Sequence, residues 1–287
     1  MVPSYRKVYF PNDSKHDSVL TPSQADWYSA LAVPDKHHQT PMSELDPKRH
    51  RERSSITAAS YSLTHLIKSE YLLDDCISEL SSRLVQLADT GKGVEFDRWL
   101  NYLAFDVIGE LTFSKRFGFV AKGQDIDNSI GNMRFLMFYQ ALMGYMYWLH
   151  PFLLHSPFAG ILGLRPHAHI FKTVVKALDE RKENPDKRQD MASLWIKNQQ
   201  KYPERMAEHE IQAVAGMTTI AGSETMTGAL ESVFYFMARY PKVRAELQRE
   251  LDDAQAAGKL SEVVQHKEAK ELPFLQACVS RHSRELV

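Results

Sequence analysis

The spacing of apolar residues along the chain predicts a mostly α-helical protein. Between residues 71 and 92 the apolar positions recur every three or four residues, and Gly91 follows the last of them. This spacing is typical of an amphipathic helix that ends at a glycine. The apolar positions of this stripe are Leu72, Leu73, Cys76, Leu80, Leu84 and Leu87. A similar recurrence predicts a second helix over residues 97–113, at Phe96, Trp99, Leu103 and Val107.

The longest predicted helix covers residues 204–239, between Pro203 and Pro241. Apart from glycines it contains few helix breakers, and at 1.5 Å per residue it would span roughly 45–50 Å. Apolar side chains occupy nearly all of its faces over 220–226 and 230–236, so other helices must surround it. We therefore expect residues 218–230 to be central and buried.

The rest of the chain also favours helices over strands. Asp46 and Pro47 form a helix start signal, with Asp at the N-cap and Pro at the first helical position. No segment predicts a convincing strand, and no linker or internal repeat divides the chain. Residues 1–45 carry five prolines with little periodicity and predict an irregular segment. Residues 46–287 predict a single helical domain.

The most apolar segment spans residues 133–164, MRFLMFYQALMGYMYWLHPFLLHSPFAGILGL. Glycine, histidine and proline interrupt it, so it offers no uninterrupted membrane span. We expect two or more helices, broken near Pro151 and Pro157, that cover the face above Gly222. Two interpretations remain open: buried core or substrate pocket, which the pattern favours, and an interfacial surface rich in methionine and aromatic residues.

Composition narrows the class of protein. The 287 residues are 44% hydrophobic and include 35 Lys+Arg and 36 Asp+Glu, for a net charge of -1. With a mean hydropathy of -0.38, this is typical of a soluble globular protein and gives no basic excess for nucleic acid. The two cysteines, Cys76 and Cys278, lie far apart, which argues against a disulfide framework or a zinc site. The amino terminus resembles neither a signal peptide nor a membrane span.

Residues 218–230, TTIAGSETMTGAL, place poor helix formers inside the longest predicted helix. Gly222 costs about 1 kcal/mol against Ala there, and hydroxyl side chains compete for backbone hydrogen bonds. One interpretation is a packing notch for a crossing helix, with the hydroxyls bonded back to the preceding turn. The other is a face where Gly222 admits a flat cofactor, a loosened helix frees carbonyls for water, and Glu224 and Thr225 deliver protons.

Several motifs taken in order resemble one family, the cytochrome P-450 haem-thiolate monooxygenases. The central helix of that family carries Ala/Gly-Gly-x-Asp/Glu-Thr-Thr, which residues 221–225 match, with Met226 in place of the second threonine. The later motifs are MARYPKVRAELQREL and LPFLQACV, and the earlier ones are DPKRHRERSSITAASYS and FDRWLNYLAFDVIGELTFSKRFGF. The resemblance covers residues 40–285 and is closest in character to fungal members.

This resemblance implies the helical part of the cytochrome P-450 fold, with haem as cofactor and an apolar small molecule as substrate, in secondary metabolism. A reductase would supply electrons. Glu224 and Thr225 would be catalytic, and Ala221 and Gly222 would face the haem. His50 matches the propionate-binding helix, where Ser54 replaces the family's arginine and Arg53 could substitute. The location implied is cytoplasmic or peripheral on the endoplasmic reticulum, with possible membrane contact and no nucleic acid.

The chain also departs from the family, which suggests truncation at both ends. The iron-ligating cysteine of the family lies in a loop beyond the LPFLQA motif, and the sequence ends at Val287. Neither Cys76 nor Cys278 is a convincing substitute, and a pair at His167 and His169 is the runner-up iron site.

Near the carboxyl end, Arg281 stands where the family has glutamate, three residues before a matching Arg284. We expect an open groove beside residues 218–230, a poorly packed tail from residue 281, and no activity for the chain alone. The alternatives are a non-catalytic family remnant that binds a ligand or protein, and an unrelated helical scaffold.

Overall fold

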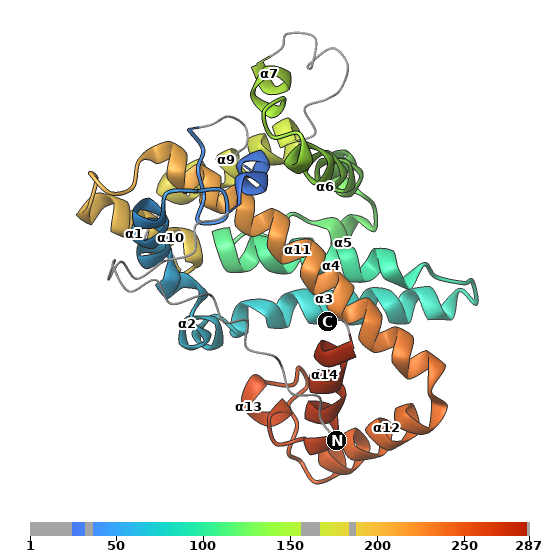
Figure 1. Ribbon diagram of the computed structural model, residues 1–287. Coiled ribbons are helices and arrows are strands. Elements are labelled where there is room, and N and C mark those ends of the chain that lie inside the picture. The colour runs from blue at the N-terminus through green and yellow to red at the C-terminus, as the bar shows by residue number, and fades with distance from the viewer. Residues whose placement is uncertain (1–24, 32–36, 156–166, 184–187, 286–287) are drawn as a thin grey trace, which may run out of the picture.

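The longest helix forms the axis of the protein. The structure is a computed structural model that describes residues 25–31, 37–155, 167–183 and 188–285. In it α11 runs without interruption over Glu208–Arg239, and Figure 1 shows this helix passing diagonally among the others. The predicted long helix is confirmed, except that it begins four residues later than residue 204. The loosening that one interpretation placed near Gly222 is absent, because α11 is helical throughout this stretch.

The other elements are also helices, and the described residues contain no strand. This confirms the predicted mostly α class. The elements before α11 are η1 (Asp26–Leu31), α1 (Pro47–Thr57), η2 (Ala58–Tyr61), α2 (Leu63–Lys68), α3 (Tyr71–Asp89), α4 (Phe96–Phe113), α5 (Phe119–Lys122), η3 (Ile126–Asn128), α6 (Ser129–Tyr145), α7 (His150–His155), α9 (His167–Glu183) and α10 (Met191–Lys201). Those after it are α12 (Pro241–Ala256), α13 (His266–Ala269) and α14 (Pro273–Glu285).

Two predicted helix boundaries rest on the residues that mark them in the sequence. The Asp46 carboxylate accepts hydrogen bonds from the backbone N–H groups of Lys48 (2.7 Å) and Arg49 (3.2 Å) at the start of α1. Pro47 occupies the first helical position, where its missing N–H costs nothing. Gly91 follows α3 with φ 67°, a left-handed conformation that glycine adopts without strain.

The core lies where α4 crosses α11 and α3. Helix α4 is buried along most of its length, and its most extensive contacts are with α11. The side chains of α9 and α10 close the core, and the Trp195 indole within it donates a hydrogen bond of 2.9 Å to Ser60 Oγ. The core includes Phe105, Phe119, Met133, Leu178, Trp195, Ile211 and Val214.

A buried carboxylate fixes the connection between α4 and α5. Asp106 is 1% exposed and accepts hydrogen bonds from the backbone N–H groups of Gly118 (2.6 Å), Phe119 (3.2 Å) and Val120 (2.9 Å). Burial raises the pKa of this carboxyl, while the three amide hydrogen bonds act in the opposite direction. A polar group inside α4 is therefore satisfied by the turn that it organises.

The apolar segment 133–164 is broken into helices near Pro151, as predicted. Helix α6 ends at Tyr145 and α7 begins at His150, so the break precedes Pro151, which is the second residue of α7. A proline tolerates this position because its N–H would have no helical partner. Pro157 lies outside the described residues. Short η1 docks on α6, where a Cβ atom at Gly144 would lie 2.0 Å from the Trp27 Nε1 atom.

Residues 218–230 are central but only half buried, which corrects the expectation that they are enclosed. Ser223 and Thr227 are buried at 0% and 3% exposure, whereas Thr225, Gly228 and Ala229 are exposed. The buried face of α11 packs on α4.

Candidate functional site

Gly222 faces another helix rather than a cofactor. A Cβ atom there would lie 2.6 Å from Ile108 Cδ1 on α4. The neighbouring hydroxyls bond back along the helix, from Ser223 Oγ to the Thr219 carbonyl (2.8 Å) and from Thr225 Oγ1 to the Ala221 carbonyl (2.7 Å). These contacts are those of the packing-notch interpretation, in which hydroxyls satisfy themselves within the helix.

An apolar groove runs beside the same stretch of α11, on the side away from Gly222. It encloses about 210 Å³ and has contributions from η1, residues 40–42, α6, α9 and α11. Ala221 and Thr225 lie on its wall, one helical turn apart. An open groove beside residues 218–230 is present, as expected, whereas the expectation that Thr225 is buried with the rest of this stretch is wrong. The lining residues are Leu31, Thr40, Met42, Met137, Gln140, Phe171, Ala213, Gly216, Met217, Ile220, Ala221 and Thr225.

Helix α6 covers the groove, but not the face above Gly222 as the sequence suggested. Its groove residues, Met137 and Gln140, are three positions apart and so share one face of the helix. Across the groove from them lie Ile220, Ala221 and Thr225. The predicted relation between the apolar segment and α11 therefore holds for the groove and not for the glycine.

Glu224 does not line the groove. One of its carboxylate oxygens is buried without a hydrogen-bond partner among the described residues. Burial raises the pKa of this carboxyl, and the charge of Arg134 on α6 partly opposes that rise. A carboxyl group held in this way favours its protonated form relative to an exposed glutamate.

His50 and Arg53 hold the amino-terminal wall of the groove in place. The His50 Nδ1 atom lies 2.7 Å from the Pro41 carbonyl oxygen, between the groove residues Thr40 and Met42. Arg53 Nε donates to Glu210 Oε1 at 3.0 Å, and the guanidinium also pairs with Glu44. This largely buried ion pair links α1 to the first turn of α11. The role of residues 40–42 was missed from the sequence, because a proline-rich segment carries no periodic signal.

The described residues do not fit the iron-ligand part of a haem-thiolate site. Cys76 is 1% exposed on α3, its thiol facing the Leu72 carbonyl, and burial raises its pKa to about 12. Cys278 lies on α14, and burial likewise raises the pKa of its thiol. Neither cysteine lines the groove, whereas iron ligation requires an accessible thiolate.

Other metal ligands do not replace a cysteine. Over the residues that the structure describes, no cluster of three or more histidine, cysteine or acidic side chains could hold a metal ion. The side chains of His167 and His169, the runner-up iron site, lie outside the described residues, as do those of Arg281 and Arg284. The expectation of a poorly packed tail therefore stays a prediction.

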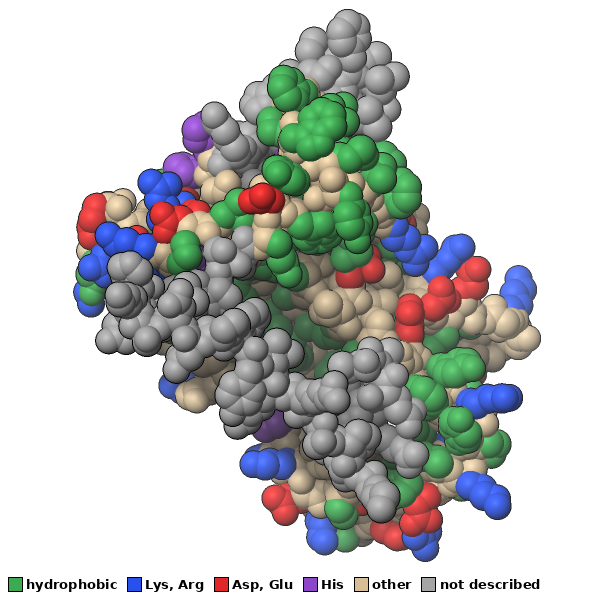
Figure 2. Space-filling model, in the orientation of Figure 1, with side chains coloured by type: hydrophobic (Ala, Val, Ile, Leu, Met, Phe, Trp, Pro, Cys, Tyr) green, Lys and Arg blue, Asp and Glu red, His purple; other side chains and the backbone are tan. Residues whose placement is uncertain are grey.

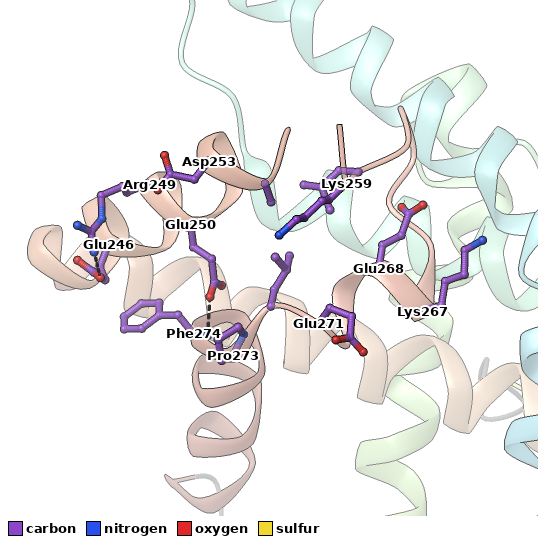
Figure 3. A pocket seen from close by; sticks show the side chains of 13 residues that line it. Glu246, Arg249, Glu250, Asp253, Lys259, Lys267, Glu268, Glu271, Pro273 and Phe274 are labelled. Atoms are coloured by element: carbon purple, nitrogen blue, oxygen red, sulfur yellow. Dashed lines mark hydrogen bonds and ion pairs between the residues drawn. The ribbon is translucent and has the colours of Figure 1, made fainter. Parts of the chain in front are cut away.

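A larger cavity, about 740 Å³, lies among α12, α13 and α14. Figure 3 shows charged side chains of both signs around it. The Glu250 carboxylate accepts hydrogen bonds from the backbone N–H groups of Phe274 (2.8 Å) and Leu275 (2.9 Å), so it caps α14. Arg249 pairs with Glu246 on the same helix. Two of the charged groups here are thus already engaged, Glu250 in joining α12 to α14 and Arg249 in a pair within α12.

The apolar segment also forms an exposed surface. Figure 2 shows apolar side chains gathered at the top of the molecule, over α6 and α7. Phe138, Tyr145, Trp148 and Phe152 are 66%, 83%, 63% and 72% exposed, while Leu136, Tyr139 and Met143 on the other side of α6 are buried. One side of α6 is therefore buried core, and the other side presents apolar side chains to the surface. Among the described helices, none combines the length and apolar content needed to cross a membrane.

Comparison with known proteins identifies the family. The family model described as Cytochrome P450 matches residues 12–280. The chain therefore belongs to the cytochrome P450 family. Its backbone is similar to a crystal structure of a cytochrome P450 (CYP102L1), with a TM-score of 0.68 and 17% sequence identity, over 90% of this chain and 54% of that one. At this identity the likeness shows the fold alone.

Similar proteins from fungi have the same family name. A cytochrome P450 monooxygenase of Aspergillus terreus is 29% identical over 91% of this chain and 55% of its own length. The cytochrome P450 monooxygenase cicH of Emericella nidulans is 32% identical over 83% of this chain and 49% of its own length. The chain thus spans about half the length of the curated relatives that it matches.

Proposed function

We propose that this chain provides the ligand-binding helical wall of a cytochrome P450 monooxygenase that oxidises an apolar small molecule in secondary metabolism. The observation that carries the proposal is the groove beside Ala221 and Thr225, where apolar side chains from five parts of the chain meet. Concave apolar sites with few polar groups are typical of small-molecule binding.

The six residues singled out in the sequence take different parts in this proposal. Ala221 and Thr225 lie on the side of α11 that faces the ligand, and Gly222 sets the distance between α11 and α4. His50 and Arg53 act indirectly, because they hold in place the segment that carries Thr40 and Met42. Glu224, with its buried carboxyl, is a proton reservoir one residue from Thr225.

Haem is the cofactor that membership of the family implies, and it would supply the iron at which oxygen is activated. The described residues present a wall for such a group but no thiolate, so we assign no chemical step to it here. We propose that oxidation requires a sulfur other than those of Cys76 and Cys278, together with electrons from a reductase. The alternative function, a non-catalytic ligand- or protein-binding module, is favoured if no such sulfur acts with this chain.

Binding of naphthalene to the 287-residue protein tests the groove. We expect saturable binding, measured by naphthalene fluorescence, that weakens at least about tenfold in Ala221→Trp because the indole would fill the groove. Ala229→Trp places the same side chain at an exposed position of α11 outside the groove, and it should bind as the wild type does. Equal binding by both variants would exclude the groove as the site.

The exposed aromatic side chains of α6 and α7 support a further part of the proposal, peripheral contact with a membrane. Tryptophan and tyrosine favour the interface, where one end of the ring is apolar and the other wet. The protein should float with neutral phosphatidylcholine vesicles, and replacing Trp148 and Phe152 by serine should release it. Flotation that is unchanged in this double variant would contradict membrane contact through α6 and α7.

A further inference from the structure

One residue in the groove differs in chemistry from the rest. Among the described residues that line the groove, Gln140 on α6 is the one with a side-chain amide. Its neighbours on the wall are mostly apolar, including Met137 on the same face of α6 and Ile220 across the groove. Gln140 is half-buried. An amide carries both a donor and an acceptor, and a ligand that covered them without offering partners would bind at a desolvation cost.

The other polar side chains of the groove are already committed. Thr40 Oγ1 accepts hydrogen bonds from the backbone N–H groups of Met42 and Ser43, both at 3.2 Å. The Thr225 hydroxyl donates to the Ala221 carbonyl at 2.7 Å. Gln140 has no hydrogen bond, ion pair or ring contact among the described residues. Among the polar side chains described in this wall, the Gln140 amide therefore keeps its donor and its acceptor available for a ligand.

We propose that Gln140 is a specificity-determining residue, and that the ligand of the groove is an apolar molecule with a carbonyl or hydroxyl group that meets the Gln140 amide. The inference rests on the proposed function and adds a polar requirement to it. The amide donates to a ligand carbonyl and exchanges either role with a ligand hydroxyl. The apolar remainder of the ligand packs against Met137, Met217 and Ile220.

Three probes of similar shape test this assignment on the whole protein: naphthalene, 2-naphthol and 2-acetylnaphthalene. We expect both polar probes to bind the wild type about five- to tenfold more tightly than naphthalene, the range of one net hydrogen bond. Gln140→Met keeps the length and the helical preference of the side chain without its amide. In this variant the two preferences should disappear while the affinity for naphthalene is retained, which also shows that the groove is intact.

Further variants separate the amide from general effects. In Gln140→Glu, measured at pH 8, the side chain accepts but no longer donates, so the preference for 2-acetylnaphthalene should be lost and that for 2-naphthol kept. Met137→Leu changes the same face of α6 without polar chemistry and should keep both preferences. If Gln140→Met does not fold, Gln140→Leu provides the same comparison.

The outcomes distinguish this inference from the proposed function. If naphthalene binds but the polar probes bind no more tightly, or if their preference survives in Gln140→Met, the role of Gln140 is wrong and the groove stands. If no probe binds the wild type, both the groove and the role of Gln140 are refuted.

Discussion

Gly222 of α11 and Ile108 of α4 meet where the two helices cross, and a Cβ atom at position 222 would lie 2.6 Å from Ile108 Cδ1. This contact gives the glycine a structural reason that does not involve a cofactor. It lets α4 pack against the buried side of α11, while Ala221 and Thr225 remain on the groove side.

Replacing this glycine should show a packing penalty. Gly222→Ala gains about 1 kcal/mol of helix propensity but overpacks the crossing by about 1–3 kcal/mol, so we expect a net loss of folding stability in urea unfolding. Gly228→Ala is the matched control, because a Cβ atom there would contact nothing within 4 Å, and it should stabilise the protein. Ile108→Val removes the clashing methyl and should rescue Gly222→Ala; additive effects in the double variant would contradict the contact.

The ion pair of Arg53 should contribute strongly to stability. Arg53→Met leaves Glu44 and Glu210 as largely buried, unpaired carboxylates, and we expect a loss of about 3 kcal/mol in the free energy of unfolding. Arg98→Met breaks the pair with Glu95, whose side chains are 62% and 66% exposed, and should cost less than about 1 kcal/mol. Equal losses in the two variants would show that Arg53 is not held as described.

Glu224 should make stability depend on pH. Because its folded-state pKa is raised by burial, its contribution is complete below the unfolded pKa, about 4.3, and is lost as the pH rises through the folded value. Glu224→Gln should therefore gain stability relative to the wild type between pH 4 and pH 7. Glu262→Gln, at an exposed position, is the matched control for the loss of one carboxyl group. A constant difference for Glu224→Gln across this range would remove the case for a buried carboxyl.

The Cys76 thiol should be unreactive in the folded protein. Its pKa of about 12 and its burial leave little accessible thiolate, so iodoacetamide at pH 8 should modify it at least about a hundredfold more slowly than in the denatured chain. Mass spectrometry of Cys278→Ser, in which Cys76 is the remaining cysteine, measures this rate directly. Rapid modification of the native variant would place Cys76 at an accessible site.

Local sequence patterns predicted where the helices begin and end better than they predicted what packs against each helix. The start of α1 at Asp46 and the extents of α4 and α11 followed from capping and periodicity, which act within a few residues. Which face of α11 is open could not be read in this way, because Thr225 is exposed for lack of a neighbour rather than by its own chemistry. The same holds for Gln140, since a groove built from five separate parts of the chain leaves no mark in any one of them.

We propose that this chain provides a groove wall for an apolar ligand but no cysteine able to ligate haem iron. The most direct test is the absorption spectrum of the purified 287-residue protein with added haem, reduced under carbon monoxide. We predict that the red-shifted Soret band of a thiolate-ligated iron is absent. Its appearance in the wild type, and its loss in Cys76→Ser or Cys278→Ser, would contradict the account.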